Sequence, residues 1–255
     1  VLFRRQRQMC IRDSNIPFYG LAEVTVGGRS CVISQTGFSG ESGYEIYLRN
    51  ATLYADDMWD AVLEAGKKHN LMVIAPAHHR RIQAGILSWG QDLDHEHNPF
   101  QCNLGYQVSL SGKGEWEKKG DYIGKQALEK MKADLKDGHK PYKLQLVGFE
   151  IGGKPIDEYA PDFWLVSPGD GGDPCGFITS PWYHPEKGKN IAMGYIPFDG
   201  TLNSNGFPKW ELGKKFKVHL PDIYADEPGV PVDAVTVDVP FTESFNANTR
   251  EVVKG

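Results

Sequence analysis

The sequence predicts an α+β protein in which a mixed region of helices and strands precedes a small β-barrel. Three observations support this fold class. Apolar residues repeat at helical spacing only before about residue 140, and a polar stretch at 137–141 follows. After that stretch the pattern changes to short apolar runs that glycine and proline interrupt at close intervals, as in small barrels and sandwiches.

The first region begins with two short strands at 20–26 and 30–34, joined by a Gly-Gly turn typical of a hairpin. Residues 36–43 are rich in glycine and predict a tight loop. The strand at 44–48 then alternates, so that Glu45 lies in the middle of the strand on the face opposite Tyr44.

Three helices are expected in the same region, at 53–69, 76–89 and 121–134. Pro76 suits the first turn of the second helix, where its missing N–H group costs nothing. The six short apolar runs of the second region predict strands at 144–151, 163–166, 176–179, 191–196, 216–220 and 234–239.

Composition excludes several classes of protein. The chain has 255 residues, a net charge of −5 and a pI near 5.9, so no bulk positive charge attracts nucleic acid. No apolar run is long enough for a membrane-spanning helix. The four cysteines form no C-x-x-C pair, so we expect free thiols in a reducing cytoplasm rather than disulfides or structural zinc.

Residues 1–14 (VLFRRQRQMCIRDS) carry four arginines and no helical or strand periodicity. No apolar stretch follows them, so they do not form a signal peptide. The segment resembles translated sequencing-adaptor read-through, and we expect it to be a non-native leader. The alternative is a genuine disordered basic arm.

Glu45 is the first candidate for chemistry. Glycines before it let a flat ligand approach the backbone closely. An ionised carboxylate accepts two parallel hydrogen bonds, and a reduced pterin presents two adjacent N–H donors on one edge. The alternative is that Glu45 lies on the solvent face of a half-buried strand.

Five segments together resemble the glycine-cleavage T-protein family. TGFSGESGYEIYL is similar to that family's T-G-[YF]-[ST]-G-E-x-G-[YF]-E-[IL]-[YF] signature. APAHHRRIQAGILSWGQDLD, DHEHNPFQCNLGYQVSL and DYIGKQAL resemble the elements that follow it. GFITSPWYHPEKGKNIAMGYIP resembles the signature of the family's C-terminal barrel. The matches occur in the family's order over nearly everything after residue 14.

The resemblance implies a partial folate-binding α+β domain at 15–139 and a C-terminal barrel at 140–255. It implies tetrahydrofolate as the cofactor, with Glu45 on the pterin edge and Tyr44 beside it. Arg81 would serve the folate site or a substrate carboxylate, for which its planar fork is suited; the alternative is a surface salt bridge. Gln83, Gln101, Ala77 and His184 depart from the family's usual residues.

Within the family the sequence is most similar to the branch that contains dimethylsulfoniopropionate demethylase. We therefore expect methyl transfer to folate from a small sulfonium or ammonium donor. Such a donor needs alignment rather than a protein nucleophile, and aromatic faces hold its charge. Trp182 and Tyr183 are candidates for the site, with Phe38 and Trp164 also near the motifs; each could instead fill the core.

Two other functions of the same family stay open. One is the aminomethyltransferase, which works with a lipoyl carrier protein, and the other is the folate domain of a dimethylglycine or sarcosine dehydrogenase. A non-catalytic folate-binding relative would carry a K-G-C-Y-x-G-Q motif, which does not occur here. The family's catalytic aspartate lies in an N-terminal portion with no counterpart here, so we name no catalytic residue and expect the chain alone to be inactive.

Two clusters of titratable residues complete the prediction. His78, His79, Arg80 and Arg81 lie where a helix begins, and they predict either an anion site or a solvated basic patch. The acidic and histidine-containing run at 92–97 lacks the spacing of a helical metal site, so we expect a charged loop and no metal. A homodimer is one option for the oligomeric state.

Overall fold

The computed structural model describes residues 16–17, 19–110 and 121–241. The chain forms two compact units, one that ends at Ala77 and one that begins at His78. Each is described by itself below. The leader expected at 1–14 lies outside the described residues. The domain boundary expected near residue 140 stays a prediction.

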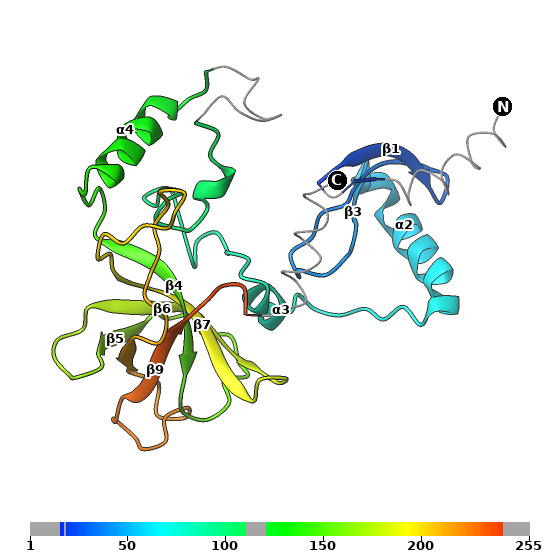
Figure 1. The fold of residues 1–255 in the computed structure, drawn as a ribbon. Coiled ribbons are helices and arrows are strands. Elements are labelled where there is room, and N and C mark those ends of the chain that lie inside the picture. Colours follow the sequence, from blue (N-terminus) through cyan, green and yellow to red (C-terminus); the bar gives the residue numbers. More distant parts are fainter. Residues whose placement is uncertain (1–15, 18, 111–120, 242–255) are drawn as a thin grey trace. The chain divides into compact units, whose positions relative to one another are not determined.

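The first unit is a three-stranded antiparallel sheet covered on one face by a helix (Figure 1). The strands are β1 (Leu21–Val26), β2 (Arg29–Ser34) and β3 (Glu45–Leu48), and β2 lies in the centre. Gly27 and Gly28 both have positive φ, which gives the hairpin turn the twist that suits β-strands. The two predicted strands and their turn are therefore confirmed.

Helix α2 (Ala51–Gly66) continues into a short 3-10 helix, η1 (Lys67–His69), as expected for 53–69. Met58 and Val62 of α2 pack against the sheet, because Val24, Cys31 and Ile33 point to that face. Cross-strand pairing places Glu45 beside Ser34 of β2, on the opposite face from this core. After η1 the chain runs on without secondary structure to the end of the unit.

The second unit is built around a closed barrel of six antiparallel strands in the order β4-β7-β6-β5-β8-β9, which confirms the predicted β-barrel (Figure 1). Closure brings backbones close together: a Cβ on Gly176 would lie 2.0 Å from the carbonyl oxygen of Tyr195. Val147, Phe149, Val166 and other buried apolar residues fill the interior. The strands are β4 (Leu144–Ile151), β5 (Trp164–Pro168), β6 (Gly176–His184), β7 (Lys189–Pro197), β8 (Lys215–Val218) and β9 (Val232–Val237).

Strand β6 is longer than predicted, and the expectation that it ends at Thr179 is wrong. The strand passes through Pro181, which pairs with Ala192 of β7. The ladder between β6 and β5 covers only residues 176–178, so at Pro181 the strand has one neighbour and the missing N–H group breaks no ladder. Trp182 and Tyr183 consequently lie in a strand.

Helix α3 (His78–Gln83) is much shorter than the predicted helix at 76–89. Gly85 has a φ of 69°, which helix residues do not adopt. Its N–H group donates to the Ile82 carbonyl (2.9 Å), and the N–H group of Ile86 donates to the Arg81 carbonyl (2.8 Å). These two bonds form a Schellman motif that ends the helix. A Cβ at Gly85 would also lie 2.4 Å from Val239.

The remaining elements of this unit form a smaller apolar cluster. Helix α4 (Lys125–Lys136) begins after Gly124, whose φ of 90° excludes it from the helix, so the helix begins later than the predicted residue 121. Leu135 of α4 packs with Phe100 and Phe198. A short 3-10 helix, η2 (Gly105–Gln107), lies between α3 and α4 in the sequence. None of the helices among the described residues has the length and apolar character needed to cross a membrane.

Candidate functional site

Glu45 is the first residue of β3, not a mid-strand residue as predicted. It is half-buried on the sheet face that α2 does not cover. Its Oε2 atom accepts a short hydrogen bond from the Thr36 hydroxyl and another from the Tyr47 hydroxyl at 3.1 Å. Ser34 Oγ and Thr36 Oγ1 lie 2.6 Å apart, so a chain of hydroxyl groups leads to the carboxylate.

The Oε1 atom of Glu45 has no hydrogen-bond partner among the described residues. A carboxylate has about four lone-pair sites, and the two donors already occupy those of Oε2. The site as it stands therefore accepts one N–H group of a pterin edge at Oε1. It accepts two parallel N–H groups once the Tyr47 hydroxyl turns away, and the carboxylate thus fits the cofactor that the resemblance implies.

Aromatic side chains near Glu45 are exposed. Tyr44, which precedes β3, is 49% exposed, and Phe38 in the glycine-containing loop is 51% exposed. Gly37 of the same loop has open space where a Cβ would be. The part of Tyr44 in folate binding stays a prediction.

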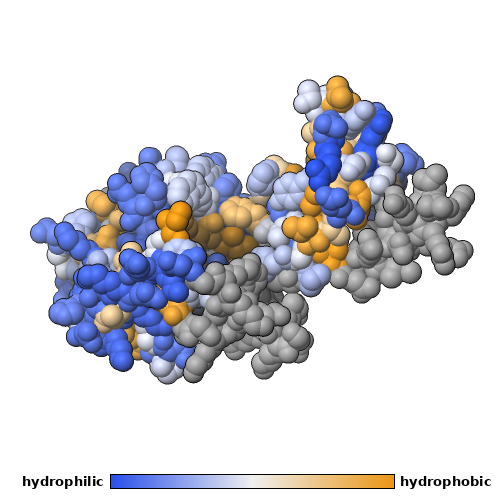
Figure 2. Space-filling view, turned by 90° about the horizontal axis from the view of Figure 1, so that it is seen from above, coloured by the Kyte–Doolittle hydropathy of each residue, from blue (hydrophilic) through white to orange (hydrophobic). Residues whose placement is uncertain are grey.

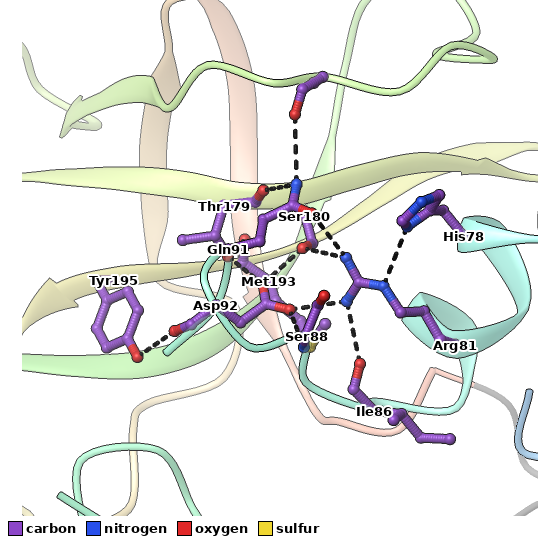
Figure 3. A network of polar contacts seen from close by, with 11 residues as sticks. His78, Arg81, Ile86, Ser88, Gln91, Asp92, Thr179, Ser180, Met193 and Tyr195 are labelled. Atoms are coloured by element: carbon purple, nitrogen blue, oxygen red, sulfur yellow. Dashed lines mark hydrogen bonds and ion pairs between the residues drawn. The ribbon is translucent and has the colours of Figure 1, made fainter. Parts of the chain in front are cut away.

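Arg81 lies in the second unit and is 1% exposed, so it forms no surface salt bridge (Figure 3). Its Nε donates to His78 Nδ1 (3.3 Å). Its Nη1 donates to Asp92 Oδ2 (2.7 Å) and to the Ile86 carbonyl (3.1 Å). Its Nη2 donates to Ser180 Oγ (2.8 Å) and Gln91 Oε1 (3.2 Å). All five guanidinium N–H groups thus have acceptors within the protein.

Asp92 is the centre of this network. Its Oδ2 accepts from Arg81 and from the backbone N–H of Ser88 (2.8 Å). Its Oδ1 accepts from the hydroxyl groups of Thr179 (2.5 Å) and Ser180 (2.6 Å). The buried carboxylate thus has four hydrogen-bond donors, one of which is the guanidinium of Arg81, and such partners offset the cost of its burial.

The network extends further into the barrel (Figure 3). The Tyr195 hydroxyl donates to the Asp92 carbonyl at 2.6 Å, and burial raises the pKa of Tyr195 far above its ordinary value. The Gln91 amide donates to the Thr179 carbonyl at 2.7 Å. Helix α3, the turn at 88–92 and strands β6 and β7 are therefore held together by one set of buried polar contacts.

Histidines and aromatic rings lie beside this network. The His78 ring is 4.8 Å from that of Tyr159, and the His79 ring is 6.0 Å from that of Trp182. Burial lowers the pKa of both histidines. Trp182 packs against the cluster that contains Ile82.

The structure therefore brings Arg81 and Trp182 into the same unit, at neighbouring positions on α3 and β6. Tyr183 is half-buried on β6, and its backbone N–H donates to the Ile156 carbonyl at 2.8 Å. Ligand contacts by Arg81, Trp182 and Tyr183 stay predictions. Tyr44 and Glu45 belong to the other unit.

The run at 92–97 is not simply a charged loop, because Asp92 is buried. Asp94 accepts from His97 Nδ1 at 2.8 Å and from the Glu96 backbone N–H at 2.8 Å, and the Glu96 bond is the main cause that lowers the pKa of Asp94. Within the described ranges, no group of three or more His, Cys, Asp or Glu side chains is arranged to hold a metal ion.

The sequence predicted no role for Gln91, Thr179 or Ser180, and it predicted Asp92 only as part of a charged loop. A signal was present, since the quoted motifs contain the Gly-Gln-Asp and Thr-Ser segments. The pairing itself joins positions 88 residues apart, and nothing in spacing or periodicity indicates it.

Comparison with known proteins gives a consistent result. Residues 3–112 match the family model described as the GCVT N-terminal domain. An aminomethyltransferase from Caldanaerobacter subterraneus subsp. tengcongensis is 31% identical over 181 residues, which cover 70% of this chain and 43% of that protein. One from Symbiobacterium thermophilum is 33% identical over 186 residues, which cover 71% and 44%. The chain thus spans less than half the length of these relatives.

Among solved structures, the glycine cleavage system aminomethyltransferase T from Bartonella henselae has the same fold, with a TM-score of 0.59 and 20% identity. The match covers 90% of this chain and 54% of that one. In sequence the chain is therefore similar to the GCVT N-terminal domain and to aminomethyltransferases, and it shares its fold with one of them.

Proposed function

We propose that the chain is the folate-binding part of a tetrahydrofolate-dependent one-carbon transferase, and that Glu45 receives the pterin edge. The observation that carries the proposal is the half-buried carboxylate of Glu45, which has one oxygen open to a donor and lies beside a glycine-containing loop. The named relatives are aminomethyltransferases, which supports transfer of a one-carbon unit as the reaction.

Titration of tetrahydrofolate against the full chain, followed by ligand-detected NMR, tests the role of Glu45. Replacing the carboxylate by an amide in Glu45→Gln removes one acceptor oxygen and its charge. Hydrogen bonds to charged groups contribute about 1.5–3 kcal/mol, so affinity should fall at least about tenfold.

Glu23→Gln is the matched control, because Glu23 lies on the same sheet face in β1 and pairs only with exposed Arg49 among the described residues. It should leave folate affinity unchanged. Equal affinity of the Glu45→Gln variant and the unmodified chain would remove the basis of the proposal.

The donor separates two versions of the reaction. The relatives favour an aminomethyl group delivered by a lipoyl carrier protein. The absence of an arginine at Ala77 favours a small sulfonium or ammonium methyl donor, held by rings such as Trp182 and Tyr183.

Product analysis with a version of the protein that spans its relatives decides between the two donors. Formation of 5-methyltetrahydrofolate from dimethylsulfoniopropionate supports methyl transfer. Formation of methylene-tetrahydrofolate only with a lipoyl carrier supports aminomethyl transfer. We further propose that the 255-residue chain alone has little activity, since it spans less than half of its relatives. Turnover at the rate of the longer protein would contradict this.

A further inference from the structure

Two hydroxyl groups and the Glu45 carboxylate form a chain of hydrogen bonds with one direction. Ser34 Oγ lies 2.6 Å from Thr36 Oγ1, and the Thr36 hydroxyl donates to Glu45 Oε2. An ionised carboxylate only accepts hydrogen bonds, and a hydroxyl group has a single proton to donate. Thr36 therefore gives its proton to Glu45 and accepts at its contact with Ser34. The order of donation is Ser34 to Thr36 to Glu45.

The three-stranded sheet fixes the backbone of all three residues. Ser34 of β2 and Glu45 of β3 are paired directly across the two strands, so their side chains lie on the same face. Gln35, which precedes Thr36, donates its N–H to the Gly20 carbonyl at 3.0 Å. Thr36 thus follows directly on a paired stretch of backbone, which limits where its hydroxyl group can lie.

The burial of these residues is the reverse of that expected for a strand that faces solvent. Ser34 is 8% exposed, and Thr36 and Glu45 are half-buried. Tyr44 and Tyr47 are instead 49% and 55% exposed. Figure 2 shows exposed hydrophobic surface on the part of the molecule that contains this sheet. Burial of a hydroxyl group costs free energy unless its hydrogen bonds are made, so the hydroxyl chain has a role other than contact with water.

The bond from Thr36 leaves the carboxylate able to bind a ligand. It uses one lone pair of Oε2, and no donor among the described residues reaches Oε1. Thr36 differs in this from Tyr47, whose hydroxyl must turn away before Oε2 accepts from a ligand as well. A glutamate side chain has much rotamer freedom, and holding it in one direction beforehand lowers the entropy cost of binding.

We propose that Thr36 and Ser34 are positioning residues of the folate site. Ser34 orients the Thr36 hydroxyl, and that hydroxyl holds the Glu45 carboxylate with Oε1 open to the pterin edge. The affinity of the site therefore depends on two hydroxyl groups that do not touch the ligand. This inference rests on the proposed function, because the ligand that Glu45 receives is the one proposed there.

Titration of tetrahydrofolate against variants of the full chain, followed by ligand-detected NMR, tests the positioning role. Thr36→Val keeps the shape of the side chain and removes the hydroxyl, so affinity should fall about three- to tenfold. Thr36→Ser keeps the hydroxyl and should restore affinity to within about twofold of the unmodified chain. Ser34→Ala leaves Thr36 able to donate but without a set direction, so the loss should be smaller, about two- to threefold.

Thr25→Val is the matched control and should leave affinity unchanged. Thr25 lies on the same sheet face in β1, and its hydroxyl makes no hydrogen bond to the residues that the structure describes. In a Glu45→Gln background, Thr36→Val should have no further effect, because the hydroxyl acts only through the carboxylate.

Unchanged affinity in Thr36→Val, or failure of Thr36→Ser to restore it, would overturn the positioning role, whereas weaker binding by Glu45→Gln would still support the folate site. Equal binding by Glu45→Gln and the unmodified chain would instead remove the folate site itself. Far-UV circular dichroism checks that each variant is folded. If Thr36→Val unfolds, Ser34→Ala carries the test, and unchanged affinity in that variant would overturn the proposal.

Discussion

The barrel and the three-stranded sheet differ in how they pair the hydrogen-bonding groups of their backbones. In the barrel every strand has two neighbours, and the buried charge of Arg81 meets that of Asp92 inside the unit. In the sheet, β1 and β3 each have one neighbouring strand within the part of the chain that the structure describes, and apolar residues that follow η1 are exposed. The difference indicates that closure of the sheet, together with the buried ion pair, leaves fewer polar and apolar groups of the barrel open to solvent.

Removal of the carboxylate at the centre of the barrel network should destabilise the chain most. Asp92→Ala leaves the guanidinium of Arg81 buried without its partner, which should cost about 3–5 kcal/mol of unfolding free energy. Chemical denaturation followed by near-UV circular dichroism measures the loss.

Asp233→Ala is the control for that variant. Asp233 also pairs with a cation on the barrel, at 2.8 Å from Lys217, but its side chain is 87% exposed. The denaturation midpoint of this variant should match that of the unmodified chain. Equal effects of the two substitutions would mean that the buried network does not stabilise the barrel.

Two isoleucines, one in each unit, differ strongly in burial. Ile178 in β6 is 1% exposed, and Ile74 is 69% exposed. Ile178→Ala should cost about 2–5 kcal/mol because it leaves a cavity. Ile74→Ala should leave the stability of the isolated chain unchanged, since its side chain already contacts water. A comparable loss for Ile74→Ala would show that this side chain is buried in solution.

Histidine titration gives a smaller effect confined to the barrel. His184 is 2% exposed, its Nε2 has no hydrogen-bond partner among the residues that the structure describes, and burial lowers its pKa below the ordinary 6.5. The unfolded chain therefore binds more protons below about pH 6.5 than the folded chain does. The free energy of unfolding should be highest above that pH. It should fall as the pH decreases, with a slope of at most about 1.4 kcal/mol per pH unit for one proton.

Denaturation at a series of pH values checks the histidine prediction. His184→Ser should have a shallower loss of stability between about pH 6.5 and pH 5 than the unmodified chain. Because His78 and His79 also have lowered pKa values, part of the slope should persist. An identical slope in both proteins would remove His184 from the explanation.

The smallest expected effect lies at Glu45. Tyr47→Phe removes a donor that competes for Oε2, so tetrahydrofolate should bind about two- to fivefold tighter, within the ~1 kcal/mol of one neutral hydrogen bond. The same change in a Glu45→Gln background should have no effect, and this double-mutant cycle isolates the contact. Weaker binding in Tyr47→Phe would mean that the hydroxyl itself serves the ligand.

Much of the fold could be predicted from local patterns. The β1–β2 hairpin and all six barrel strands were found because alternation and turn residues are encoded within a few positions. The end of α3 was predicted wrongly, although Gly85 is a typical residue for a helix C-terminus. Apolar residues at helical spacing continue past Gly85, and the pattern does not reveal that it adopts a positive φ.

The site was less predictable than the fold. Glu45 was identified by its motif, but the hydroxyl groups around it come from residues 9 positions before it and 2 after it. The burial of Arg81 depends on Ser180, 99 positions away, and burial of a charge follows from tertiary pairing rather than from local sequence. Such long-range contacts are visible only in the folded chain.

The return of the chain to α3 has a consequence for biosynthesis. The Phe241 N–H donates to the Gln83 carbonyl at 2.9 Å, and Phe241 packs in the same cluster as Ile82. During synthesis, α3 leaves the ribosome before β6 and β7, and long before Phe241. Nascent α3 is too short to persist alone in water. We therefore expect α3 to pack in its final position only after Phe241 has been synthesised. Until then Arg81 and Asp92 should be exposed to chaperones that bind nascent chains.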